Sequence, residues 1–205
     1  MQPCCMWHCC RRPVEIMFAG LAAVASVLVL PLGLVHCGHT FAVSAVMVNN
    51  GGDWGRRGNW EMCPPGTFAR GFSVKVERAQ GGGDDTALNG VRLYCSGRPQ
   101  VYVESTVAPW GHWTSDKICS SGKLTAFQLR VEAKQGDGDD TAANNVRFRC
   151  SNGEVMEGDG TSWGSWGLWS TECEKGVCGI QTMVEPEQGT GDDTALNDLM
   201  LNCCP

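Results

Sequence analysis

A seven-residue sequence occurs three times in this chain of 205 residues. It reads GDDTALN at residues 83–89, GDDTAAN at residues 138–144 and GDDTALN again at residues 191–197. The second copy follows the first by 55 residues, and the third follows the second by 53. A period of this length is typical of a supersecondary unit that packs against its own copies. We therefore expect three similar structural units, and any function of the heptapeptide is expected in three related places.

Each repeat carries the same features in the same order. A Trp-Gly pair comes first, and a cysteine follows it. Next comes a segment with apolar residues at alternate positions, such as residues 72–77, and then the heptapeptide. A second alternating segment ends the repeat at another cysteine. This alternation is typical of strands with one buried face, and the repeats show no helical period. The sequence thus predicts an all-β fold with three repeats, over about residues 43–98, 99–153 and 154–205.

The N-terminal segment differs in composition from the repeats. Arg11 and Arg12 precede residues 16–35, which are uncharged and rich in Leu, Val and Ala. A basic flank before an apolar segment is the pattern of a secretory signal peptide. We therefore expect residues 1–39 to be a signal peptide and residues 40–205 to be a single secreted, extracellular domain without membrane contact. The apolar segment is also long enough to span a bilayer, so a retained signal anchor is the alternative.

Eight of the 13 cysteines lie beyond the predicted leader. An even number of cysteines behind a secretion signal is typical of a disulfide framework rather than a metal site, and we expect no metal or cofactor. Because the cysteines follow the repeat, pairs within each repeat are favoured, and the two that are unique to the third repeat pair with each other. The predicted disulfides are Cys63–Cys95, Cys119–Cys150, Cys173–Cys203 and Cys178–Cys204. An exchange of the adjacent Cys203 and Cys204 remains open.

The heptapeptide has a structural and a functional interpretation. Asp and Thr side chains can hydrogen-bond nearby backbone N–H groups and stabilise turns, which favours a structural role. The next residue is Gly90, Asn145 or Asp198, and these residue types tolerate the left-handed conformation, so we predict a positive φ there. The alternative is a binding role for the carboxylates and amides. The candidate binding residues are Asp84, Asp85, Asp139, Asp140, Asp192, Asp193, Asn89, Asn144 and Asn197.

Tryptophans follow the repeat as well. The three corresponding sets are Trp54, Arg57 and Trp60; Trp110, Trp113 and Asp116; and Trp163, Trp166 and Trp169. Trp buries a large area, and its N–H can meet a backbone carbonyl, so we favour packing between strands and sheets. A platform that stacks sugar rings is the alternative. Arg57 would replace the missing ring by a cation–π contact if it lies over a neighbouring aromatic side chain.

The charge of the chain limits the classes of partner. The formal net charge is −6 at pH 7, which argues against nucleic acid and anionic membranes as partners. Neutral glycans or a basic extracellular protein such as lysozyme are compatible with this charge.

Several segments together resemble the vitelline membrane outer layer protein family. They are PPG at 64–66, GFSVKVE at 71–77, GDDTALNG at 83–90, AANNVRFRC at 142–150 and GDDTALND at 191–198. The resemblance implies a disulfide-stabilised β-prism, in which three antiparallel sheets related by a pseudo-threefold axis form the sides. It also implies a secreted structural or binding protein of an extracellular coat, such as the outer layer of the egg vitelline membrane. The alternative function is a carbohydrate-active transferase on N-acetylglucosamine oligomers, for which the resemblance supplies no catalytic residues.

Overall fold

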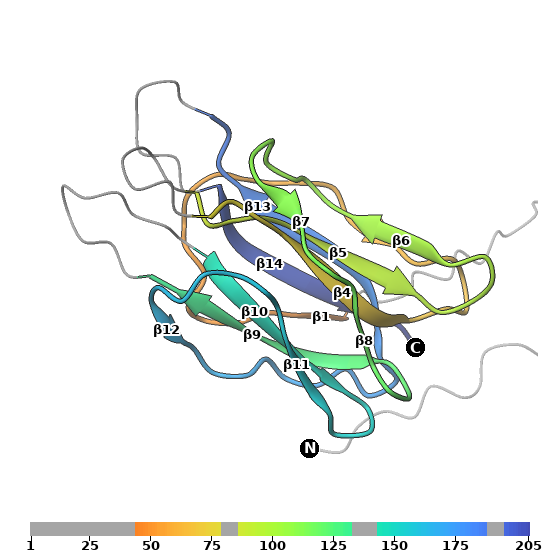
Figure 1. Cartoon of the computed structure of the whole chain (residues 1–205). Helices are drawn as coiled ribbons and strands as arrows, with labels where there is room; N and C mark the ends of the chain where they lie inside the picture. Colours follow the sequence, from red (N-terminus) through yellow and green to blue (C-terminus); the bar gives the residue numbers. More distant parts are fainter. Residues whose placement is uncertain (1–43, 79–85, 133–142, 188–194) are drawn as a thin grey trace, which may run out of the picture. The chain divides into compact units, whose positions relative to one another are not determined.

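The computed structural model describes residues 44–78, 86–132, 143–187 and 195–205. In these ranges all regular secondary structure is β-strand, arranged in three antiparallel sheets around a shared core (Figure 1). The described residues belong to one compact unit, Phe41–Pro205. A helix long and apolar enough to cross a membrane does not occur among them. The all-β prediction is confirmed. The predicted leader and the exact limits of the three repeats stay predictions.

A hairpin of two eight-residue strands forms the centre of each sheet, and the last two residues of the heptapeptide begin its second strand. The hairpins are β4 (Ala69–Val76) with β5 (Leu88–Cys95) in sheet B, β9 (Leu124–Val131) with β10 (Ala143–Cys150) in sheet C, and β13 (Val177–Val184) with β14 (Leu196–Cys203) in sheet A. In Figure 1 the strands β4, β9 and β13 run toward the same end of the domain, and their partners run back from it.

Short strands extend each hairpin on both sides. The strands beside β5, β10 and β14 are β6 (Val101–Glu104), β11 (Val155–Glu157) and β1 (Ser44–Val46). Those beside β4, β9 and β13 are β7 (His112–Trp113) with β8 (Lys117–Ile118), β12 (Ser165–Trp166), and β2 (Arg56–Arg57) with β3 (Glu61–Met62). Sheets A and B thereby have five strands and sheet C has four.

The Trp-Gly segment of each repeat lies on the sheet of the preceding repeat. β7 and β8 belong to the second repeat but pair with β4 of the first, and β12 of the third repeat pairs with β9 of the second. The ring closes because β2 and β3, near the start of the first repeat, pair with β13 of the third. Sequence repeat and sheet are therefore offset, and each sheet is completed by a neighbouring repeat.

Aromatic and aliphatic side chains from the inner faces of the three sheets form the core. The Phe72 and Phe148 rings lie 4.5 Å apart between their centroids, and Phe127 and Phe148 lie 6.3 Å apart. All three are fully buried, as are Leu199 and Leu201 of sheet A. Full burial of one such side chain contributes roughly 1.5–3 kcal/mol. The alternating apolar positions read from the sequence are the residues that fill this core.

The four disulfides have the pairing that the repeat predicts. They are Cys63–Cys95, Cys119–Cys150, Cys173–Cys203 and Cys178–Cys204. In each of the three repeated pairs, the backbone N–H of the first cysteine donates to a strand of one sheet. The second cysteine ends a strand of the next sheet. Sheet A is thus joined to sheet B, sheet B to sheet C, and sheet C to sheet A. The fourth bridge stays within sheet A.

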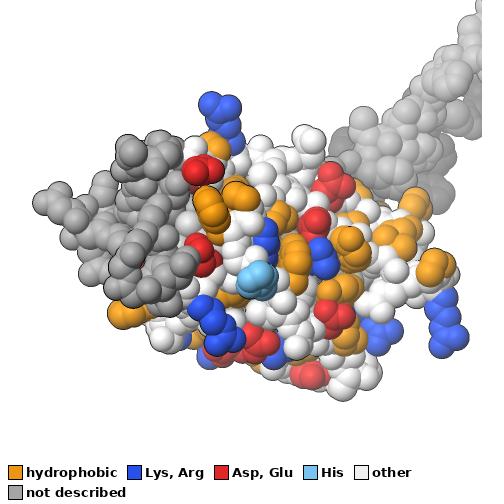
Figure 2. Space-filling view, turned by 45° about the horizontal axis from the view of Figure 1, so that its top comes forward, with side chains coloured by type: hydrophobic (Ala, Val, Ile, Leu, Met, Phe, Trp, Pro, Cys, Tyr) orange, Lys and Arg blue, Asp and Glu red, His pale blue; other side chains and the backbone are white. Residues whose placement is uncertain are grey.

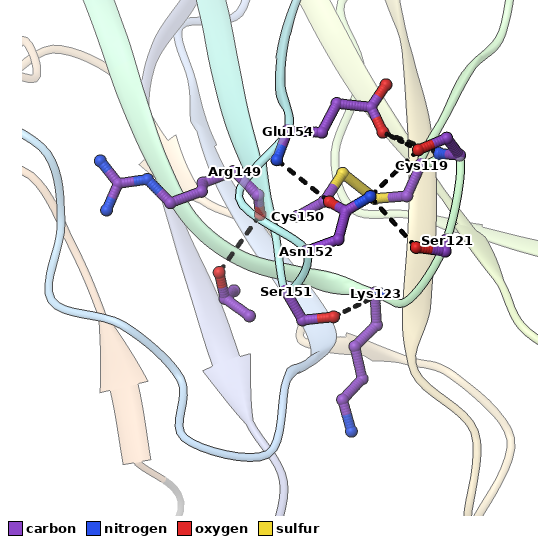
Figure 3. The surroundings of a disulfide bond; sticks show 10 residues. Cys119, Ser121, Lys123, Arg149, Cys150, Ser151, Asn152 and Glu154 are labelled. Carbon is purple, nitrogen blue, oxygen red and sulfur yellow. Dashed lines mark hydrogen bonds between the residues drawn. A yellow bond between two sulfur atoms is a disulfide. The ribbon is translucent and has the colours of Figure 1, made fainter.

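Polar side chains surround the bridge between sheets B and C (Figure 3). Asn152 Nδ2 donates to the hydroxyls of Ser120 at 3.0 Å and Ser121 at 3.1 Å, and its Oδ1 accepts from the Glu154 backbone at 3.0 Å. Ser120 donates from both its hydroxyl and its N–H to Glu154 Oε2. These two bonds lower the pKa of the Glu154 carboxyl. The turn after β10 is therefore tied to the segment after β8, across the seam between two sheets.

The predicted positive φ at Gly90, Asn145 and Asp198 is wrong. Within the described residues the left-handed position is the alanine of the heptapeptide, with φ of 53° at Ala87 and 51° at Ala195. The residue after the heptapeptide varies for another reason, which is the size of its neighbour. A Cβ on Gly90 would lie 2.8 Å from a methyl of Val107, whereas Asp198 faces a glycine, Gly51, of the adjacent segment.

Candidate functional site

The six candidate aspartates of the heptapeptides lie outside the described residues. These are Asp84, Asp85, Asp139, Asp140, Asp192 and Asp193. Their binding role, and the transferase alternative that would need carboxylates, stay predictions. The described residues contain no cluster of three or more His, Cys, Asp or Glu side chains placed to hold a metal ion.

The three candidate asparagines, Asn89, Asn144 and Asn197, are fully buried. Asn89 Nδ2 donates to Thr86 Oγ1 at 2.7 Å and to the carbonyl of Ala87 at 3.3 Å. Asn197 donates in the same way to Ala195. The asparagine amide therefore binds the carbonyl of the left-handed alanine, which supports the structural interpretation of this part of the heptapeptide.

The Trp-Gly turns lie against the strand ends that lead into the heptapeptides. Their glycines have φ of +94° at Gly55, +73° at Gly111 and +71° at Gly164. A Cβ atom on these glycines would lie 2.2 to 2.4 Å from main-chain atoms of Val184, Val76 or Val131. Both the conformation and the close approach require glycine. Each turn is thereby fixed at the same end of its sheet, against the last residue of β4, β9 or β13.

The tryptophan of each turn is exposed to solvent. Its exposed fraction is 56% for Trp54, 42% for Trp110 and 58% for Trp163. The prediction that these side chains pack between strands and sheets is wrong, and the physical reason is the glycine turn. The turn contacts the sheet edge through its backbone, and strand residues already fill the core. The three rings are therefore accessible to a ligand, at corresponding places in the three repeats.

Trp166 and Trp169 lie outside the core and pack against arginines of β10. Arg147 lies 4.1 Å from the ring centroid of Trp166, and Arg149 lies 4.4 Å from that of Trp169. Where Asp116 replaces the third tryptophan, it accepts a hydrogen bond of 2.6 Å from Tyr94. The hydrogen bond that Arg57 makes to Asp198, at 2.9 Å, directs its guanidinium to a carboxylate.

At two of the three exposed tryptophans, backbone carbonyls accept hydrogen bonds from a basic side chain of the neighbouring strand. Lys75 Nζ donates to the carbonyls of Ala108 at 2.8 Å and Pro109 at 2.7 Å, just before Trp110. Arg130 Nε donates to the carbonyl of Trp163 at 3.0 Å. Met183 is the corresponding residue of sheet A, because it faces Arg57 in β2 as Lys75 faces Trp113 in β7. Lys75 and Arg130 were not predicted as site residues, although both follow the alternating pattern of their strands.

A cavity of about 580 Å³ lies beside the Trp110 turn. It lies between the edge of sheet B and the segment that follows β11 in sheet C. Its lining includes Glu77, Arg78, His112, Thr114 and Asp159. These side chains offer carboxylate acceptors, hydroxyls, an imidazole and a guanidinium, so the cavity can both donate and accept hydrogen bonds. Basic and acidic side chains are interspersed on the face shown in Figure 2, without a continuous patch of one sign.

Comparisons with solved structures show the same fold at low sequence identity. A variant of Malaysian banana lectin matches with a TM-score of 0.51 and 11% identity, over 80% of this chain and 99% of that one. Artocarpin in its complex with mannotriose matches with a TM-score of 0.52 and 9% identity, over 80% and 98%. The three antiparallel sheets thus form a β-prism of the lectin type.

Comparisons of sequence are more specific. The vitelline membrane outer layer protein 1 homolog of Homo sapiens is 54% identical over 168 residues, which cover 78% of this chain and 83% of that protein. The homolog of Mus musculus is 50% identical over 191 residues, covering 86% and 95%. The family model for vitelline membrane outer layer protein I matches residues 44–205. The chain therefore belongs to the vitelline membrane outer layer protein I family.

Proposed function

We propose that this protein is a secreted structural component of an extracellular coat, of the vitelline membrane outer layer type, that binds glycans at the Trp-Gly end of its prism. Secretion is supported by the leader pattern of residues 1–39 and by the four disulfides, because such bridges persist in oxidising compartments. The coat role is supported by the names of its relatives.

The observation that carries glycan binding is the exposure of Trp54, Trp110 and Trp163 on turns that cannot move freely. The C–H face of a sugar ring is apolar and packs well on a flat aromatic ring, whereas its hydroxyls need nearby polar groups. The glycine turns fix the backbone beside all three rings, and hydrogen bonds from Lys75 and Arg130 fix it further at two of them, before any ligand arrives. This lowers the entropy cost of binding.

Binding to an array of neutral and acidic glycans tests this proposal. The full chain is expressed in secreting eukaryotic cells, and the N-terminal sequence of the secreted protein shows whether the leader is removed. We expect binding to neutral oligosaccharides, and we expect the triple variant Trp54→Ala/Trp110→Ala/Trp163→Ala to lose it. Leu168→Ala is the matched control for the loss of exposed apolar area, since this leucine is 71% exposed but has no aromatic ring. Unchanged binding by the triple variant would overturn the proposal.

A further inference from the structure

We infer that the three corners of the prism are not equivalent, and that one pocket beside Trp110, opened by Thr114, is the single high-affinity site for a short neutral oligosaccharide. The inference rests on the proposed function and specifies its site and stoichiometry. It depends on a comparison of residues that occupy the same place in the three repeats.

Backbone hydrogen bonds identify the first set of equivalent residues. The N–H groups of Gly58, Thr114 and Gly167 each donate to a central strand of the neighbouring sheet, at 2.9 Å in all three cases. Each of these residues also lies four positions after an exposed tryptophan. Two repeats therefore have glycine at this position, and the other repeat has threonine.

A second set faces the first across each seam. The N–H groups of Gly52, Ala108 and Thr161 each donate at 2.8 Å to the carbonyl of a heptapeptide asparagine. The residues two positions earlier are Asn50, Thr106 and Asp159, which are therefore equivalent. The three seams consequently contain the pairs Gly58 with Thr106, Gly167 with Asn50, and Thr114 with Asp159.

The two glycine corners are closed. A Cβ atom on Gly58 would lie 2.2 Å from Thr106 Oγ1, and a Cβ atom on Gly167 would lie 2.3 Å from Asn50 Cγ. Asn50 also donates to the carbonyl of Leu129 at 3.1 Å. The side chain across the seam therefore occupies the space that a larger residue would need, and it fills the corner.

The threonine corner is open. The Thr114 side chain takes the place into which the opposing residue inserts at the other corners, and its Oγ1 accepts from the N–H of Val74 at 3.3 Å. Asp159 is held by an ion pair with Lys117 at 2.8 Å. Both Thr114 and Asp159 line the cavity of about 580 Å³. One glycine-to-threonine difference thus accounts for a pocket at this corner.

The chemistry of the pocket fits a neutral oligosaccharide of two or three sugars. Its volume lies within the range of small-molecule sites, about 300–1,000 Å³. Glu77 and Asp159 accept hydrogen bonds from sugar hydroxyls, and His112 and Arg78 donate to ring or acetamido oxygens. Carboxylates and basic groups are balanced, so the ligand needs no charge of its own. Gly111 of the lining directly follows the exposed Trp110, whose ring is the stacking surface that we assign to this site.

Calorimetric titration with triacetylchitotriose and with mannotriose tests the inference. We expect one site per molecule for the tighter of the two. The double variant Thr114→Gly/Asp159→Asn reproduces the closed corner of Gly167 and Asn50, and we expect at least tenfold weaker binding. Leu168→Ala, the exposed control of the glycan-array experiment, is expected to leave the affinity and the stoichiometry unchanged. Thermal unfolding of each variant verifies that it is folded.

His112 gives a readout specific to the pocket, because it is the single histidine after residue 39. We expect the trisaccharide to shift the ring resonances of His112 in NMR spectra of the secreted protein, with the same concentration dependence as the calorimetric signal. Three equal sites, or a bound state that leaves His112 unshifted, would refute the single pocket but leave the proposed function intact. Failure of the wild type to bind any neutral oligosaccharide would overturn the proposed function itself.

Discussion

The glycine of the Trp-Gly turn makes a quantitative prediction, because the chain supplies its own control. Gly164 and Gly153 both have positive φ, +71° and +87°. A Cβ atom on Gly164 would lie 2.2 Å from the carbonyl oxygen of Val131, whereas one on Gly153 would have nothing within 4 Å. Alanine at either position costs roughly 1–2 kcal/mol for the left-handed conformation. Only alanine at 164 must also move the turn away from the strand.

The added cost at Gly164 follows from the contacts that hold the turn. β12 pairs with β9 through two residues, and Arg130 bonds the carbonyl of Gly164 at 3.1 Å. Losing two such bonds costs about 1–3 kcal/mol. We therefore expect Gly164→Ala to lower the free energy of unfolding by about 2–5 kcal/mol, and Gly153→Ala by about 1–2 kcal/mol.

Guanidinium unfolding followed by circular dichroism measures both free energies with the disulfides intact. The slope with denaturant should stay the same in the two variants, because the fold and its exposed area are unchanged. Equal losses at the two positions would refute the argument that close approach, and not backbone conformation alone, requires glycine in the Trp-Gly turn.

Three further predictions concern the core, the unique disulfide and a buried carboxyl. Phe148→Ala should lower the free energy of unfolding by about 3–5 kcal/mol, whereas Phe148→Leu, the residue type of the other two repeats, should cost less than about 1.5 kcal/mol; equal losses in denaturant titrations would contradict this. Removal of the Cys178–Cys204 bridge, with a sequence separation of 26, should cost about 3–4 kcal/mol without loss of the fold, since the three bridges between sheets remain; an unfolded double alanine variant would show otherwise. Burial raises the pKa of Asp198 despite its bond from Arg57. The stability of the wild type relative to Asp198→Asn should thus be greatest below about pH 3.9, the unfolded value, and fall as pH rises through the folded pKa. A flat difference between pH 3 and 7 would be inconsistent with that shift.

Much of the fold could be predicted from the sequence because the repeat multiplies weak signals. One alternating segment identifies a strand poorly, but three copies in the same order, each ended by a cysteine, leave little choice. The same symmetry selected the pairs of Cys63, Cys119 and Cys173. This pairing needed no knowledge of the distances between cysteines, because residues that are equivalent in the repeat are expected to have equivalent partners.

The offset between repeat and sheet could not be predicted in this way. A repeat gives the order of elements but not whether the Trp-Gly segment pairs within its own unit or with the preceding one. Pairing is decided by backbone contacts such as that between Gly111 and Val76, which leave no periodic pattern. The left-handed position was misplaced for a related reason. Tolerance of positive φ is a weak preference, and the asparagine bond to Ala87 overrides it.

The exposed tryptophans were wrongly predicted to be buried, because Trp side chains are on average highly buried in proteins. Trp54, Trp110 and Trp163 are each followed by glycine, and this signal was available. A glycine required on one side of a turn indicates that the backbone, not the preceding side chain, contacts the sheet. Trp166 is also followed by a glycine, but Gly167 does not have a positive φ, and the Trp166 ring packs on its sheet against Arg147.

Three features that all repeats share have structural explanations in the described residues. The turn glycine lies against a strand, the asparagine is buried at the hairpin, and the cysteines join sheets. The prism therefore needs the turn glycine, the asparagine and the cysteines in all three repeats. A ligand site is better sought where the repeats differ at equivalent places, since a fold that tolerates glycine at Gly58 and Gly167 but carries Thr114 has changed one corner while the framework stays the same. The pocket beside Trp110 is where such a difference produces a cavity.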